Sequence, residues 1–221
     1  RIAYRNIRNV IYLLIADGIA EVETVGFAVL AGLPLPLLQA QLLWLNIVTN
    51  GIQDVALAFE RGHGNELASP PRRPVESVFD RLMVERGLLA GGWMAAVGFG
   101  AFVLMLESGM TVEMARSDLL LLMVLLQNVD AFNARSETLS AFRNPLANNP
   151  LLAAGVFAAL LLHVGAMHVP LMQRVLDIGP ITADQWLVFP AAALSLLAVM
   201  ELHKAGWKWR RRGAGDAGAG V

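Results

Sequence analysis

The segment from Gln41 to Asp54 is the feature that most limits what this chain can fold into. It is apolar enough to enter a bilayer, yet it carries polar side chains at Asn46, Thr49, Asn50, Gln53 and Asp54. Burying such groups in hydrocarbon costs free energy unless they pair or bind a ligand. Residues 46, 50 and 54 follow one another at steps of four, so one helical face presents a ladder of side-chain oxygens. The pattern favours a functional face over a polar seam that only joins helices.

Gly51 lies within this segment and predicts that the helix is interrupted near Asn50 and Gly51. Glycine weakens a helix, and local unwinding would turn backbone carbonyls toward the polar face. Interrupted helices with carbonyls and amides at membrane depth are how transporters build cation sites. The segment therefore predicts a cation site on an interrupted membrane helix.

Composition places the chain among polytopic membrane proteins. Of its 221 residues 56% are hydrophobic, and the mean hydropathy is +0.55, which is too apolar for an ordinary soluble domain. We expect an all-α bundle of six transmembrane helices, forming one cation-binding domain over residues 1–212, with a disordered tail over 213–221. The expected helices cover about 4–31, 37–59, 84–106, 118–134, 150–169 and 184–205. The chain has no cysteine, which excludes disulfides and thiolate metal sites.

The distribution of Lys and Arg orients the expected bundle. If both termini and the even-numbered connections share one side, that side carries every Lys and Arg except Arg116 and Arg174. By the positive-inside rule both termini are then cytoplasmic, and Trp207 and Trp209 at the basic end of the chain indicate an interfacial anchor. The Ala-, Arg- and Gly-rich composition suggests a bacterial protein, and hence the plasma membrane.

Acidic and amide side chains recur at a similar depth in two other expected helices. Asp17 and Glu21 are four residues apart on one face of the first helix, and Gln127 and Asp130 are three apart on the fourth. No Lys or Arg is expected near this depth, so these groups are not explained by structural salt bridges. Oxygen ligands suit hard cations. The predicted site has Glu21 as its central ligand, with Asp17, Asn46, Thr49, Asn50, Asp54, Gln127 and Asp130 around it.

Other polar residues at the helix ends are expected to have no part in the site. His163 and His168 lie near the outer end of the fifth expected helix, where interfacial hydrogen bonding is the usual role of histidine. Glu201, His203 and Lys204 lie near the end of the sixth, where we expect a solvated end of mixed charge.

The central segment also resembles a known family. Its Leu-Leu-Trp-Leu-Asn-Ile-Val-Thr-Asn-Gly run, residues 42–51, is similar to the Leu-Leu-Trp-(Val/Ile)-Asn-Leu-Val-Thr-Asp-Gly segment of the sixth membrane helix of class II P-type ATPases, the family of the calcium pumps and the sodium/potassium pump. Residues 130–137 resemble the Asn-Ala-Leu-Asn-Ser-Leu-Ser-Glu end of the eighth helix, and Pro70-Pro71-Arg72 resembles the loop after the sixth. The similar pieces occur in the family's order over nearly the whole chain.

The resemblance implies that the six segments are the fifth to tenth helices of such a pump. Glu21, Asn46 and Thr49 fall on cation-ligand positions of the calcium pumps, while Asn50 falls where the family has Asp. The Gln-x-x-Asp pair at 127 and 130 is that of the sodium/potassium pump, and Asp54 could replace the charge missing at Asn50. The transported cation therefore stays open among calcium, sodium, potassium and others.

The resemblance also implies parts that this sequence lacks. The phosphorylated Asp-Lys-Thr-Gly-Thr motif, the nucleotide domain, the dephosphorylation motif and the fourth-helix Pro-Glu-Gly are absent, and no Gly-rich phosphate loop occurs. Since the chain starts at Arg1 without Met, we expect the C-terminal part of a longer protein, a cation translocase that works through an aspartyl phosphate. ATP and Mg would bind its other domains, so this part alone should not hydrolyse ATP.

The expected partners are the lipid bilayer, the pump's own phosphorylation, nucleotide and actuator domains, and its first four helices, with no nucleic acid. Within this arrangement we expect Ser69 to Pro74 to contact the phosphorylation domain. Two other classes stay open: an ion-coupled secondary transporter or channel subunit, and a purely structural membrane bundle. The first predicts an internal repeat, which the sequence does not show. A purely structural bundle does not explain why the acidic and amide side chains of several helices lie at a similar depth.

Overall fold

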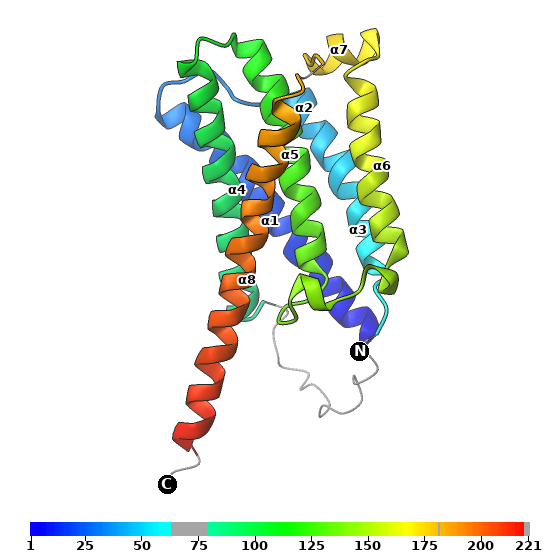
Figure 1. Cartoon of the computed structure of the whole chain (residues 1–221), viewed down its shortest axis with the longest axis vertical. Coiled ribbons are helices and arrows are strands. Elements are labelled where there is room, and N and C mark those ends of the chain that lie inside the picture. Colours follow the sequence, from blue (N-terminus) through cyan, green and yellow to red (C-terminus); the bar gives the residue numbers. More distant parts are fainter. Residues whose placement is uncertain (63–78, 181, 219–221) are drawn as a thin grey trace.

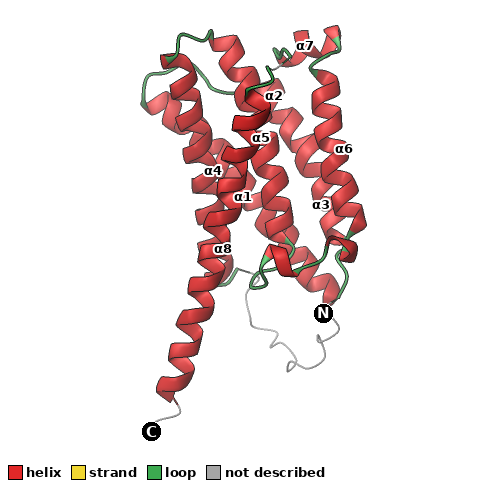
Figure 2. Ribbon diagram, in the orientation of Figure 1, coloured by secondary structure: helices red, strands yellow, loops and turns green. Residues whose placement is uncertain are grey.

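The computed structural model describes residues 1–62, 79–180 and 182–218, and within these ranges the chain is all helix and loop, without strands (Figure 2). The prediction of an all-α fold is therefore confirmed. The helices are α1 (Ile2–Leu30), α2 (Gln39–Trp44), a π-helical segment (Leu45–Asn50), α3 (Gly51–Ala58), α4 (Arg81–Glu107), α5 (Val112–Ala134), α6 (Pro150–Ala166), α7 (Pro170–Leu176) and α8 (Gln185–Gly218). Two short 3₁₀ turns, Ala141–Arg143 and Leu146–Asn148, lie in the connection between α5 and α6.

Fewer helices qualify as membrane spans than the sequence predicts. Among the described residues, α4 and the Gln185–Arg210 part of α8 are long and apolar enough to cross a membrane. The pair α6 and α7 would make a third span, although it is bent by 96° where Pro170 begins the second helix. α1 does not qualify because it carries too many acidic and basic residues, and α2 and α3 are each too short to cross a membrane. Length and composition therefore do not confirm the count of six.

The helix predicted over residues 37–59 is interrupted, but in a different form from the one expected. α2 ends at Trp44, the π-helical segment follows, and α3 begins at Gly51. The Gly51 N–H donates to the carbonyl of Asn46, five residues back, so the chain stays helical at this point. The prediction of an unwound break was therefore wrong. A π turn accommodates one extra residue in a helix and is common at functional sites.

Further boundaries differ from the prediction. α4 begins at Arg81 instead of 84, and α5 begins at Val112 instead of 118. α6 ends at Ala166, short of the predicted 169. α8 continues to Gly218 instead of ending near 205, so helix covers residues 213–218, where the sequence predicts a disordered tail. The predicted contact segment Ser69 to Pro74 lies outside the described residues.

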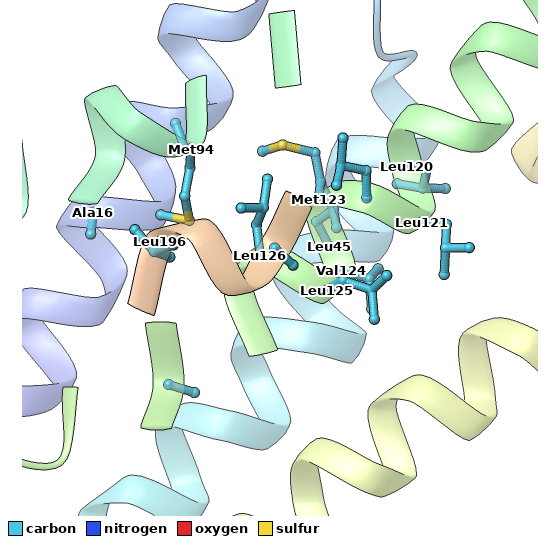
Figure 3. Packing of buried hydrophobic residues seen from close by; sticks show 14 of the residues in the cluster. Ala16, Leu45, Met94, Leu120, Leu121, Met123, Val124, Leu125, Leu126 and Leu196 are labelled. Atoms are coloured by element: carbon cyan, nitrogen blue, oxygen red, sulfur yellow. The ribbon is translucent and has the colours of Figure 1, made fainter. Parts of the chain in front are cut away.

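α5 is the central helix of the bundle, packed against α1, α4, α6 and α8 (Figure 1). Residues 117–128 are all buried, because neighbouring helices surround α5 and leave it no solvent face. Its leucines and Met123 form the centre of the apolar core together with Leu45, Met94 and Leu196 (Figure 3). The residues of the polar C-terminal end of α5, from Gln127 to Asn133, are therefore also buried among neighbouring helices, except for Val129 and Phe132, which are partly exposed.

α1 crosses the bundle diagonally and makes its most extensive contacts with α4 (Figure 1). Gly91 of α4 allows the two helices to approach closely. A Cβ added at this position would lie 2.7 Å from both the Ala16 carbonyl oxygen and the Ile19 side chain of α1. Small residues at such crossings are typical of helix packing in membranes. The close approach fixes α1 beside the core, with Asp17 and Glu21 buried.

Candidate cation site

Glu21 connects three elements of the bundle. Its side chain is 8% exposed, and its two carboxylate oxygens have separate partners. Oε1 accepts a hydrogen bond from Gln127 Nε2 of α5 at 3.0 Å, and Oε2 accepts one from Asn46 Nδ2 of the π-helical segment at 3.3 Å. The structure thus brings together three of the predicted ligands, from parts of the sequence that are far apart.

The π-helical segment supplies further polar groups next to Glu21. Asn46 Oδ1 accepts a long hydrogen bond of 3.5 Å from Asn50 Nδ2. Thr49 and Asn50 are buried, whereas Asn46 is exposed on the surface of the bundle. The group around Glu21 therefore reaches from the interior to one side of the described part of the chain.

Acceptor oxygens without a hydrogen-bond partner gather on the same helices. Buried polar atoms are nearly always paired, so several unpaired ones in neighbouring elements indicate a place for a ligand. Among the described residues, both carboxylate oxygens of Asp17 are buried and unpaired. The same holds for one side-chain oxygen each of Thr49, Asn50, Gln53, Asp54, Gln127, Asp130 and Asn133. Oxygen acceptors of this kind fit a hard cation.

The carboxylates do not form a tight cage. Asp17 is close enough to Asp130, Glu21 and Asp54 for their charges to interact. Even so, the described residues contain no group of three or more His, Cys, Asp or Glu that could hold a metal by itself. Any cation bound here would need amide and hydroxyl oxygens beside the carboxylates, as hard-cation sites commonly use.

Asp130 has different partners from Glu21. Its Oδ1 accepts hydrogen bonds from the Tyr12 hydroxyl at 2.9 Å and from Asn133 Nδ2 at 3.0 Å. Asn133 Nδ2 also donates to the Tyr12 hydroxyl oxygen at 3.1 Å. In the described structure no hydrogen bond joins Asp130 to Glu21 or Gln127. Asp130, Tyr12 and Asn133 thus form a hydrogen-bonded group of their own, here called the Asp130 group, and Asp17 is close enough to both Asp130 and Glu21 for their charges to interact.

Two basic side chains lie beside the Asp130 group, where the sequence predicts none. Arg86 is fully buried, with its guanidinium carbon 4.1 Å from the centroid of the Tyr12 ring. Lys204 is 3% exposed and donates to the Asn133 carbonyl at 3.4 Å. The predictions that no Lys or Arg lies near the acidic residues, and that Lys204 is solvated, were wrong. The Tyr12 ring and the Asn133 carbonyl, which contact Arg86 and Lys204, come from other helices. The sequence around the two basic residues therefore does not indicate that they are buried.

Side-chain pairs on either side of the π-helical segment attach it to its neighbours. Trp44 Nε1 donates to His163 Nδ1 of α6 at 3.1 Å, and Gln53 Nε2 donates to Asn128 Oδ1 of α5. His163 is fully buried within the bundle, and it has the hydrogen-bonding role that the sequence predicts. By accepting from Gln53, Asn128 joins α5 to α3. Gln53 had no predicted role, although its spacing from Thr49 places both on one helical face.

Apolar helices around buried oxygen acceptors define a membrane-type bundle suited to binding cations. Residues 34–206 match the family described as cation transporting ATPase, C-terminus. The chain belongs to this family, as the resemblance in the sequence predicts.

Relatives from different organisms agree with this assignment. A calcium-transporting ATPase of Bacillus subtilis is 33% identical over 84% of this chain, and a probable cation-transporting ATPase F of Mycobacterium bovis is 28% identical over 89%. The endoplasmic reticulum calcium ATPase srcA of Aspergillus fumigatus is 26% identical over 92%. The chain spans 21%, 22% and 24% of these relatives respectively, about a fifth to a quarter of their length.

Proposed function

We propose that this chain is the cation-binding and translocating membrane half of an ATP-driven P-type pump. The observation that carries the proposal is Glu21, which hydrogen-bonds to amides of two other elements next to several unpaired buried oxygens. In this proposal the six segments of the sequence cross a bacterial plasma membrane with both termini cytoplasmic. Residues 1–212 form the cation-binding domain.

Glu21 is the central ligand in this proposal. A cation at its carboxylate competes with the N–H groups of Asn46 and Gln127, which now occupy both oxygens. Rotation of each side-chain amide would present its oxygen to the ion in place of its N–H group. Thr49, Asn50 and Asp54 add oxygens from the adjoining helix, and Asp17 and Asp130 add negative charge.

The rest of the pump lies outside this chain. We propose that ATP and Mg bind domains elsewhere in the longer protein and that an aspartyl phosphate there drives transport. The exposed Asn46 beside a nearly buried Glu21 suggests that the site is open toward one side of the described bundle. The first four helices of the pump would cover that side and complete the ligand set.

The proposal is tested by ion-dependent phosphorylation of the intact pump from ATP, measured separately with calcium, sodium, potassium and manganese. At least one of these cations should be required for phosphoenzyme formation. Phosphorylation that needs none of them would contradict a cation site in this chain.

The same assay tests the role of Asn50. We expect wild type to favour a monovalent ion, or a cation together with a proton, because Asn50 supplies no charge. Asn50→Asp adds a carboxylate beside Glu21, so we expect the calcium concentration for half-maximal phosphorylation to fall about tenfold, as ligand charge tunes calcium affinity. Gln173→Glu, on α7 and away from the site, is the matched control. An unchanged calcium response in Asn50→Asp, or a wild type that responds only to micromolar calcium, would disprove this selectivity.

A second prediction concerns the segment before α4. We propose that residues 69–74 contact the phosphorylation domain through Arg72 and Arg73, whose forked donors suit carboxylates. Changing both to Ala should lower the cations transported per ATP hydrolysed in vesicles while leaving the fold intact. Arg116→Ala, on the opposite side of the expected membrane, serves as the control, and unchanged stoichiometry in the double variant would refute the contact.

A further inference from the structure

The C-terminal end of α3 is held by side chains from other segments. The last carbonyls of an α-helix have no partner within the helix. Asn149 Nδ2 donates to the Ala56 carbonyl at 2.9 Å, and Asn6 Nδ2 of α1 donates to the carbonyls of Ala58 and Glu60 at 2.9 and 2.8 Å. α1 and the residue that caps α6 therefore fix the end of the helix that carries part of the candidate site.

The side chain of Glu60 forms a buried ion pair directly after α3. Glu60 and Arg135 are 1% and 2% exposed. Arg135 Nε donates to Glu60 Oε2 at 3.0 Å and Nη2 donates to Oε1 at 2.8 Å, which is a forked arrangement. The other N–H groups of Arg135 bind the carbonyls of Asn144 and Pro145 at 3.0 and 2.8 Å. Removing either partner would leave the other charge buried without compensation.

This pair lies where the helices of the candidate site end. Arg135 directly follows α5, and its carbonyl accepts a hydrogen bond from Asn9 Nδ2 of α1 at 3.2 Å. Glu60 precedes the connection to α4, which contains the segment proposed to contact the phosphorylation domain. The buried ion pair thus joins the ends of α3 and α5, which carry Asp54 and Gln127, and the backbone carbonyls of the same two residues bind α1, which carries Glu21.

We infer that Glu60 and Arg135 are positioning residues that hold the end of α3 to the end of α5 and so set the spacing of the candidate ligands on these helices. The ion pair holds α3 to α5, while Asn6 and Asn9 hold the same two ends to α1, so loss of the pair would let the ligand-bearing helices shift against one another. In the described structure neither Glu60 nor Arg135 hydrogen-bonds to a candidate ligand, so the pair acts through the helices and not by coordination. The inference rests on the proposed function.

The test uses the intact pump with Glu60→Gln, Arg135→Gln, and the double variant. Three quantities are measured: cations transported per ATP in vesicles, the cation concentration for half-maximal phosphorylation from ATP, and phosphorylation from inorganic phosphate. The cation is the one, among calcium, sodium, potassium and manganese, that supports phosphorylation in wild type. Each single variant should transport fewer cations per ATP and need about tenfold more cation, a usual effect of losing a residue that supports ligands. Phosphorylation from inorganic phosphate should persist, and the double variant should recover part of the lost transport ratio.

The control is an exposed ion pair on the same side of the bundle. Arg81 Nε lies 2.6 Å from Glu85 Oε1, with the Arg81 side chain 80% exposed, and Arg81→Gln should change none of the three quantities. If the Gln variants of the buried pair do not accumulate, Arg135→Lys, which keeps the charge but loses the fork, is measured in their place. An unchanged transport ratio and cation requirement in the variants measured overturns the inference, because a purely structural pair would only lower the yield. Wild type without cation-dependent phosphorylation would instead overturn the proposed function, and this inference with it.

Discussion

Replacing Glu21 by Gln is expected to raise the cation concentration for half-maximal phosphorylation of the intact pump by roughly 100-fold or more, because ligand charge sets the affinity of hard-cation sites over orders of magnitude. Gln is close to Glu in shape: its oxygen can accept from one of the two amides, Asn46 or Gln127, and its NH2 group can donate to the other once that amide turns its oxygen toward it. The variant should therefore fold, and phosphorylation from inorganic phosphate should be kept. The loss should be specific to steps that need the bound cation.

Glu23→Gln is the matched control for this experiment. Glu23 lies on the same helix, and its Oε2 faces Gly92 of α4 instead of α5. Its replacement should shift the cation requirement by less than about twofold, as expected for a change outside the ligand set. If Glu21→Gln leaves the cation dependence as in wild type, the site has been assigned to the wrong residues.

Gly91→Ala is expected to destabilise the protein by about 1–3 kcal/mol, the usual cost of overpacking a tight interior. The added Cβ would meet the backbone carbonyl of Ala16 and the Ile19 side chain at 2.7 Å. A backbone oxygen cannot turn aside, so α1 must move away from α4. Thermal unfolding of the purified pump measures the loss, and Gly91→Val should lower the midpoint further.

Gly100 provides the comparison on the same helix. A Cβ added there meets no atom of the described residues within 4 Å, so Gly100→Ala should leave the midpoint unchanged or raise it slightly. Equal losses at both positions would show that helix propensity, and not the contact with α1, sets the effect. Asp17 directly follows Ala16, so the shift of α1 should also move Asp17. At temperatures where the protein is still folded, phosphorylation of Gly91→Ala should therefore depend less strongly on the cation than that of wild type.

Much of the helical framework could be predicted from the sequence, because apolar length and breaker residues are local signals. Gly32 with Pro34, for example, ends one helix and separates it from the next, and α5 ends at the predicted residue 134. The angle of the bend between α6 and α7 could not be predicted from the sequence. It depends on how the chain packs after Ala166, and the sequence near Pro170 only indicates that a helix can start there.

The candidate site could be predicted only in part for a similar reason. Spacing along each helix places Asn46 and Asn50 on one face, and these positions lie next to Glu21 in the bundle. Spacing does not reveal which side chains meet between helices. Tyr12 binds Asp130 from a helix more than a hundred residues earlier, and the buried Arg86 packs on its ring. These contacts give Asp130 hydrogen-bond partners different from those of Glu21.

The π-helical segment sets the rotational phase between the two halves of its helix. Trp44 points to α6, Asn46 to α1 and Gln53 to α5, and the extra residue of the π turn makes these three directions compatible. Each residue of an α-helix turns by about 100°, so rewinding the segment to regular α-helix would rotate one half against the other by about that angle. The hydrogen bonds of Trp44 with α6 and of Gln53 with α5 could not then both be kept. A change between π and α winding in this segment would therefore rotate the polar face of the helix without any movement of the neighbouring helices.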